Sequence, residues 1–342
     1  MRPENGIPDD KFDPPAMKLS RLGEFGLIDR IRQRTPIGHG VRIGIGDDAA
    51  WVENRVGSSL VTADLLIENV HFKLRWTSLF DLGHKALAVN LSDIAAMGGV
   101  PAYVILSLGI PANFDSEQID AFYRGFAALA TKTGVALVGG DTNVAKALIV
   151  SICVIGHAAY RPVRRSGAKA GDDIYITGTV GDSGLGLFML QQRMTGKKRP
   201  LLAKLLARHH RPTPRLNAGA ELAKNRLATA MIDVSDGLMQ DLGHICRASG
   251  TGATIWEERL PLSPAYQAFA SKVGTRYALS GGEDYELLFC ARARHRGRIH
   301  DLAQRLHLPM TRIGVCARSE NGLVVVNGVG KPASAGTKGH DH

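Results

Sequence analysis

Carboxylate side chains recur beside glycine, or at the ends of apolar runs, in six short segments spread along the 342-residue chain. These segments are residues 43–48, 60–64, 89–93, 137–141, 232–237 and 280–285. An apolar run followed by Gly-Asp is typical of a buried strand that enters a tight turn, so we expect the acids to meet at one edge of a sheet. Clustered acids repel one another unless cations join them. Mg²⁺ takes hard oxygen ligands and shares them with substrate phosphates, so the pattern predicts phosphoryl transfer on a carboxylate site holding several Mg²⁺ ions.

The composition is that of a globular protein, with 44% hydrophobic and 22% charged residues, and the length favours two domains. We find no run of about 18 apolar residues and no apolar stretch at the start, so we expect no membrane span and no secretion signal. The four cysteines are far apart in the sequence and form no Cys-x-x-Cys pair. They predict free thiols in a reducing, cytoplasmic setting rather than a zinc site.

The formal net charge of +10 raises the question of a nucleic-acid partner, and the densest basic stretch is 191–215. Leucines are interleaved there at helical spacing, which favours a solvated amphipathic helix. A basic rim that attracts anionic nucleotides is the second interpretation, and nucleic-acid binding is the third. Because aromatic residues make up only 6% of the chain, stacking on single-stranded nucleic acid is disfavoured, and we expect no nucleic-acid partner.

Strand and helix signals alternate along the chain and predict an α+β fold of two mixed-sheet domains. Residues 1–16 are expected to be a disordered tail, 17–160 an N-terminal domain, and 161–342 a C-terminal α+β domain. Predicted helices cover 20–34, 79–97, 116–133, 183–192, 191–215 and 237–248. Predicted strands cover 41–46, 59–63, 103–109, 135–139, 148–156, 173–177, 230–233, 253–256, 286–291 and 323–326. Asp182 or Ser183 is expected to cap the helix that begins near residue 183.

The common phosphate-binding and kinase motifs are absent: there is no Gly-x-x-x-x-Gly-Lys-[Ser/Thr], no His-Arg-Asp and no Asp-Phe-Gly. Taken in order, segments 44–49, 85–97, 138–142, 165–169, 178–182, 232–238 and 279–287 instead resemble the thiamine-monophosphate kinase family. That family belongs to a superfamily that includes aminoimidazole-ribonucleotide synthetase. The resemblance implies that the N-terminal domain, 17–160, binds ATP and metal and forms a homodimer, with ATP in a groove at the interface. It also implies transfer of the ATP γ-phosphoryl group to thiamine monophosphate, which gives thiamine diphosphate and ADP.

The resemblance assigns roles to individual residues. The implied Mg²⁺ ligands are Asp48, Thr62, Asp64, Asp93, Asp141, Asp233 and Asp236. The implied ATP-binding residues are Gly140, Asp141, Arg165 and Ser235, and the implied substrate-binding residues are His71, Glu283 and Thr337. No residue is expected to act as a general base, because the metals and Arg165 would carry the charge of the transition state.

Three points stay open from the sequence alone. Asp47 and Asp48 are adjacent, and neighbouring side chains on a strand face opposite ways, so one of the two is expected to point at the metals. Ala63 stands where the family often has a hydroxyl residue, and Thr337 stands where it tends to have an aromatic one. The alternatives in function are another ATP-dependent enzyme of the superfamily and a non-catalytic nucleotide-binding protein.

Overall fold

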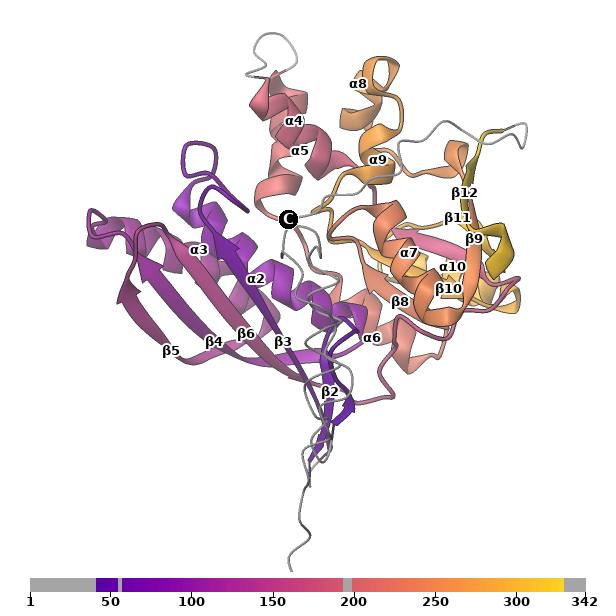
Figure 1. Cartoon of the computed structure of the whole chain (residues 1–342), viewed down its shortest axis with the longest axis horizontal. Coiled ribbons are helices and arrows are strands. Elements are labelled where there is room, and N and C mark those ends of the chain that lie inside the picture. The colour runs from indigo at the N-terminus through magenta and orange to yellow at the C-terminus, as the bar shows by residue number, and fades with distance from the viewer. Residues whose placement is uncertain (1–40, 55–56, 193–198, 329–342) are drawn as a thin grey trace, which may run out of the picture. The chain divides into compact units, whose positions relative to one another are not determined.

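Two mixed β-sheets of six strands each organise the protein in this computed structural model, which describes residues 41–54, 57–192 and 199–328 (Figure 1). The first sheet has the strand order β1-β2-β3-β6-β4-β5, in which only β4 and β5 are parallel neighbours. Its strands are β1 (Val41–Ile43), β2 (Ala50–Asn54), β3 (Gly57–Ile67), β4 (Val100–Ile110), β5 (Ala136–Val144) and β6 (Ile149–His157).

The second sheet has the order β12-β9-β11-β7-β10-β8, in which only β12 and β9 are parallel neighbours. Its strands are β7 (Asp173–Thr177), β8 (Ala230–Asp233), β9 (Thr251–Trp256), β10 (Leu287–Ala291), β11 (Met310–Arg318) and β12 (Leu323–Val326). Strands β7, β8 and β10 are buried along their whole length, as expected for the middle of a core. The two mixed sheets confirm the predicted α+β fold class.

Nine α-helices accompany the sheets in the described part of the chain. They are α2 (Leu79–Ala96), α3 (Ser116–Thr133), α4 (Asp182–Gln191), α5 (Arg199–His210), α6 (Leu216–Lys224), α7 (Leu238–Ser249), α8 (Pro264–Val273), α9 (Arg276–Ser280) and α10 (Arg296–Arg305). Helix α3 begins where the sequence predicts, because Asp115 and Gln118 form a reciprocal capping box.

Helix α2 is the central element of the fold. It is capped by Ser78, and most of its residues are buried, including the polar Lys85, Asn90 and Ser92. It contacts α3, β3 and β6 of the first sheet and also α6 and β8. Since a buried polar side chain is costly unless it is bonded, each of these three must have a partner inside the protein.

Glycine allows α2 and α3 to cross at backbone contact. A Cβ added at Gly83 of α2 would lie 2.0 Å from the Phe122 carbonyl oxygen of α3. A Cβ added at Gly125 of α3 would lie 1.8 Å from the Phe80 carbonyl oxygen of α2. This contact fixes the position of α2 over the sheet.

The first sheet has one buried and one open face. Leu60, Val104 and Val154 point toward the core that contains α2 and α3, whereas Leu65 and Tyr103 point the other way and are exposed. The alternation follows from the period of two residues in a strand.

Several elements were missed or misplaced by the sequence prediction. It missed β2, α6, α8, α9, α10 and β11 altogether. The predicted strand 41–46 ends early, at Ile43, because Gly46 adopts φ 123° in the turn after it. Neither Asp182 nor Ser183 caps α4: the N-cap is Gly181, with φ 86° and no side-chain bond, so that expectation was wrong. The predicted tail 1–16 and helix 20–34 lie outside the described residues.

We predict that Gly83→Ala lowers the free energy of unfolding by about 1–3 kcal/mol, because the added methyl group overpacks the α2–α3 crossing. Gly297→Ala in α10 is the matched control, since a Cβ there meets nothing within 4 Å. That control is expected to stabilise by about 0.5–1 kcal/mol. Urea unfolding of both variants measures the difference, and equal effects would contradict the close crossing.

Candidate active site

Three carboxylates meet where the two sheets are joined by α2. Asp48 lies after β1, Asp93 lies in α2, and Asp233 ends β8. One oxygen of each lies within 4.8 Å of the others, and Asp48 and Asp233 are buried. We call Asp48, Asp93 and Asp233 the carboxylate triad. All three were predicted from sequence as metal ligands, and the structure brings them together.

Each member of the carboxylate triad has one bonded neighbour that orients it. The Thr62 hydroxyl donates to Asp93 at 2.6 Å, and the Ser92 hydroxyl donates to Asp233 at 2.6 Å. The Arg165 guanidinium donates to Oδ1 of Asp48 at 2.9 Å. Thr62 and Arg165 were both predicted site residues, whereas Ser92 was not.

Burial and mutual repulsion disfavour the charged form of these acids. Burial, followed by the nearby Asp48 carboxylate, raises the pKa of Asp233 from 3.8 to about 8. Burial and the neighbouring Asp64, Asp233 and Asp48 raise the pKa of Asp93 well above its ordinary value. Such acids ionise readily only when a cation offsets their repulsion.

One atom in the carboxylate triad has no partner among the described residues. Oδ2 of Asp48 is buried and makes no hydrogen bond to any of them. A buried oxygen without a partner is rare in proteins. Three hard oxygen donors, one of them unsatisfied, fit the ligand preference of Mg²⁺.

The contacts of Asp47 and Asp48 show which of the two side chains points toward the other site carboxylates. Asp47 accepts the backbone N–H of Asp48 at 3.1 Å and that of Arg165 at 3.2 Å. Burial, followed by the Asp48 carboxylate, raises the pKa of Asp47 to about 6. Asp47 therefore holds two backbone segments together, and Asp48 is the one that joins the triad.

Asp64 lies beside the triad, on the side of β3 that faces α2. Its backbone N–H donates to Oδ1 of Asn90 at 3.1 Å, and burial raises the pKa of its carboxyl to about 6. Thr62 and Asp64 share one face of β3, while Ala63 lies on the other, exposed face. Replacing Ala63 by a hydroxyl residue would thus place that hydroxyl on the exposed face.

Asp236 lies in a second group rather than in the triad. Its carboxylate, that of Asp241 and one nitrogen of His244 lie within 4.8 Å of one another. Asp241 is buried and accepts the backbone N–H groups of Asp236 and Gly237 at 3.2 and 3.0 Å. Asp233 and Asp236 thus belong to different groups of close ligand atoms, and the metal role of Asp236 stays a prediction. Asp241 was missed, because an acid in the first turn of a helix is ordinary.

Gly140 and Asp141 lie on β5, at the edge of the first sheet. A Cβ at Gly140 would approach the Leu106 carbonyl oxygen to 1.8 Å, so pairing with β4 already requires the glycine. Asp141 is exposed, and its oxygens accept from the Thr142 backbone N–H and the Asn143 amide at 2.8 and 2.7 Å. Neither group of close ligands includes it, and its metal role stays a prediction.

The predicted substrate residues His71 and Glu283, and the predicted ATP residue Ser235, each make local contacts. The Ile67 backbone N–H donates to Nδ1 of His71 at 3.0 Å, which fixes the turn after β3. The Ser235 carbonyl accepts the Glu283 backbone N–H at 2.7 Å. Glu283 forms ion pairs with Lys85 and His209. Thr337 lies outside the described residues.

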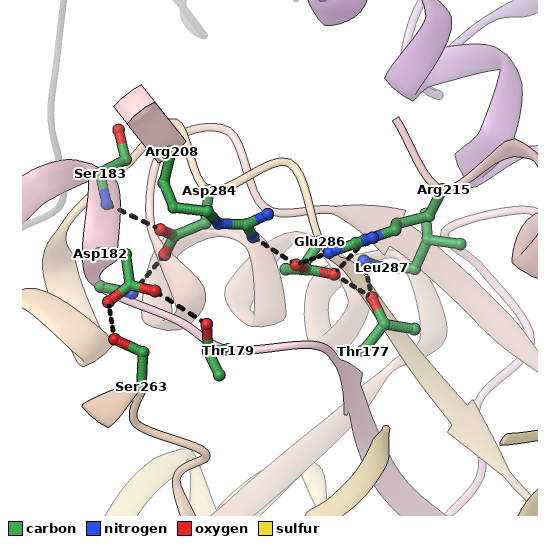
Figure 2. A network of polar contacts seen from close by, with 11 residues as sticks. Thr177, Thr179, Asp182, Ser183, Arg208, Arg215, Ser263, Asp284, Glu286 and Leu287 are labelled. Carbon is green, nitrogen blue, oxygen red and sulfur yellow. Dashed lines mark hydrogen bonds and ion pairs between the residues drawn. The ribbon is translucent and has the colours of Figure 1, made fainter. Parts of the chain in front are cut away.

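The basic segment 191–215 is not simply a solvated helix where the structure describes it. Figure 2 shows Arg208 of α5 and Arg215 converging on the buried carboxylate of Glu286, which also accepts from the Thr177 hydroxyl at 2.6 Å. Asp284 accepts the backbone N–H groups of Gly181 and Ser183 at 2.5 and 3.2 Å. The basic side chains thus secure the glycine-rich loop 281–286.

The matches to known proteins agree with the fold. Residues 46–158 match the AIR synthase related protein, N-terminal domain, and residues 169–327 match the corresponding C-terminal domain. The fold and the acids between its halves therefore define an AIR synthase related protein. No helix among the described residues is long and apolar enough to span a membrane.

Individual relatives identify the family within the AIR synthase related proteins. The thiamine-monophosphate kinase of Salmonella typhimurium is 41% identical, over 94% of this chain and 98% of its own length. A structure described as "AaThiL complexed with AMPPCP and TMP" superposes with a TM-score of 0.83 at 35% identity, covering 96% of this chain and 99% of that one. The thiamine-monophosphate kinase of Stenotrophomonas maltophilia K279a is 42% identical with a TM-score of 0.74, covering 90% and 96%. The chain belongs to the thiamine-monophosphate kinase family, which confirms the resemblance seen in the sequence.

We predict that the metal-free protein loses thermal stability between about pH 4 and about pH 8. The folded-state pKa values of Asp47, Asp64 and Asp233 are raised, so their protonation favours the folded state at low pH. That contribution is complete below the unfolded pKa and is lost as the pH rises through the folded pKa. Saturating Mg²⁺ is expected to flatten the decline, because bound cations offset the ionised carboxylates.

Differential scanning calorimetry with and without Mg²⁺ measures this effect. Asp233→Asn is the matched variant, and its metal-free melting temperature is expected to depend less on pH. A metal-free melting temperature that rises over the same range would contradict the repulsion argument.

Proposed function

We propose that this protein catalyses ATP-dependent phosphorylation of thiamine monophosphate to thiamine diphosphate by direct, Mg²⁺-assisted phosphoryl transfer. The carboxylate triad with its unpartnered Asp48 oxygen is the observation that carries the proposal. The named relatives and the structure with AMPPCP and TMP support ATP and thiamine monophosphate as the two substrates.

Asp48, Asp64, Asp93 and Asp233, with the Thr62 hydroxyl, are the residues proposed to hold Mg²⁺, with Asp141 and Asp236 as further ligands. When bound, Mg²⁺ neutralises the phosphate oxygens and aligns the acceptor with the γ-phosphorus. Thr62 and Ser92 orient their carboxylates by donating to them. No side chain is required as a general base, since a phosphate acceptor is largely ionised near neutral pH.

Arg165 is proposed to bind ATP phosphate and to carry transition-state charge. Its guanidinium lies against Asp48, and its Nε is buried without a partner in the described residues. Burial by itself lowers the pKa of Arg165, but the carboxylates of Asp48, Asp47 and Asp233 together raise it above its ordinary value, so the side chain stays cationic. A guanidinium with a free donor beside the triad is suited to a phosphate oxygen. Gly140 and Ser235 are proposed to contact ATP, and His71, Glu283 and Thr337 the acceptor.

Purified protein with Mg-ATP is expected to release ADP with thiamine monophosphate as acceptor, and to phosphorylate free thiamine poorly, because the site is suited to an anionic acceptor. Asp93→Asn should lower the turnover number by about two orders of magnitude or more while the protein stays folded. A coupled ADP-release assay across both acceptors provides the measurement.

Asp301→Asn in α10 is the control for removal of one carboxylate, since Asp301 is exposed. It should retain wild-type turnover. Preference for free thiamine, or near-wild-type turnover of Asp93→Asn, would overturn the assignment. Turnover with a different anionic acceptor would point to another ATP-dependent reaction of the superfamily.

We further propose a homodimer that forms through the open face of the first sheet. Leu65, Tyr103 and Ile105 are exposed there, Tyr103 at 52%, which is unusual for a large apolar side chain on a sheet. Asp141 pairs with Ser107 in the β4–β5 register, so it lies on this same side. A dimer built on this face would bring Asp141 to the interface, where the resemblance implies that ATP lies.

Sedimentation velocity is expected to show a dimer for the wild-type protein and a monomer for Ile105→Lys, because a charge would be buried at the interface. Tyr160→Lys, which changes an exposed aromatic residue outside the sheet, should remain a dimer. A dimer in all three proteins would refute this interface.

We also propose a cytoplasmic location and no nucleic-acid partner.

A further inference from the structure

A chain of polar side chains from three helices ends on Glu283. Nζ of Lys85 in α2 lies 2.6 Å from Oε1 of Glu283, and Nδ1 of His209 in α5 lies 3.1 Å from Oε2. The hydroxyl of Ser183 in α4 lies 3.0 Å from the same His209 nitrogen. Both carboxylate oxygens of Glu283 are thus held, and each by a different helix.

Burial separates the roles of these residues. The side chains of Lys85 and His209 are 3% and 7% exposed, whereas that of Glu283 is 21% exposed. Glu283 is thus the member of this set that reaches the protein surface. Lys85 and His209 lie behind it, and any effect they have on a bound substrate is transmitted through its carboxylate.

The opposite charges of Lys85 and Glu283 stabilise this arrangement. A lysine ammonium buried this deeply is strongly unfavourable unless an anion pairs with it. Burial alone would raise the pKa of Glu283, but Lys85 and His209 hold that pKa below its ordinary value, so the carboxylate is ionised. Burial, followed by the Lys85 charge, lowers the pKa of His209 and favours its neutral form. The neutral imidazole, protonated at Nδ1, donates to Glu283 without adding a second charge.

The backbone around Glu283 is fixed independently. Glu283 has φ 65°, and its N–H donates to the Ser235 carbonyl, while the Tyr285 N–H donates to the Val234 carbonyl at 2.9 Å. Asp284 and Glu286, which follow Glu283 in the chain, are anchored by the bonds drawn in Figure 2. The remaining freedom of Glu283 is rotation of its side chain, and Lys85 and His209 remove it.

We propose that Lys85 and His209 are positioning residues that fix the Glu283 carboxylate for contact with the organic, nitrogen-containing ring end of the acceptor. This inference rests on the proposed function. Because the triad is proposed to hold the metals that bind the phosphates, a carboxylate held apart from it, such as that of Glu283, is suited to N–H donors on the ring end. Fixing it beforehand removes the cost of ordering it when the substrate binds.

The test compares Michaelis constants for the two substrates. Lys85→Met is expected to raise the Michaelis constant for thiamine monophosphate by about tenfold or more and to leave that for ATP within about twofold. Ser183→Ala, which keeps all charges, should raise the acceptor constant by a smaller factor in the same direction. Lys224→Met removes an exposed lysine from its ion pair with Glu221 and should change neither constant.

A double variant shows whether Lys85 acts through Glu283. If it does, adding Lys85→Met to Glu283→Gln leaves the acceptor constant of Glu283→Gln unchanged, since nothing remains to be positioned. The double variant also removes both charges, so it keeps no unpaired buried ion and is expected to fold even if Lys85→Met alone does not.

These experiments distinguish a failure of the proposed function from a failure of the positioning role. Absence of thiamine-monophosphate-dependent ADP release by the wild-type protein would overturn the proposed function. With that activity present, additive losses in the double variant, or equal rises in both Michaelis constants, would overturn the positioning role alone.

Discussion

Repulsion among the buried carboxylates of Asp48, Asp93 and Asp233 is the constraint on which the rest of the site depends. These acids come from distant parts of the sequence, and folding forces them to within 4.8 Å of one another. The hydroxyls of Thr62 and Ser92 and the guanidinium of Arg165 offset part of the cost by donating to them. The rest is offset by protonation, as the raised pKa of Asp233 shows, or by cations. The divalent metal that we propose to bind here would offset this repulsion.

A single buried helix satisfies this constraint. Helix α2 supplies Asp93 to the triad, Ser92 to Asp233 and Asn90 to the backbone of Asp64. Lys85 lies more than one helical turn before these residues in α2, and it forms an ion pair with Glu283 on the loop after α9. Its polar residues are buried because each has a partner, and its apolar residues fill the core between the first sheet and α6. Stability and function are thus carried by the same eighteen residues.

The sequence predicts the acids of the site well, because short acid-bearing segments in a fixed order resemble those of a known family, and that resemblance assigns Asp48, Asp93 and Asp233. These segments are recognisable in the sequence without knowledge of their tertiary contacts. Their supporting residues are not: Ser92 and Lys85 lie within a helical pattern and acquire a role only through tertiary contacts. The division of Asp233 and Asp236 between two groups depends on the path of the chain after β8. Short helices such as α8 and α9 were missed because so few residues give little periodicity.

The glycine crossing of α2 and α3 has a consequence for how such a site diverges during evolution. With backbone touching backbone at Gly83 and Gly125, no side chain is available to repack if α2 tilts or slides. Helix α2 fixes the distance between two of its functional side chains. Lys85 and Asp93 are eight residues apart, which is about 12 Å along the helix axis. One end contacts Glu283 and the other supplies Asp93 to the triad, at a spacing set by the rise of the helix. Descendants can change acceptor preference on the 281–286 loop or α5 while inheriting the phosphoryl-transfer end intact.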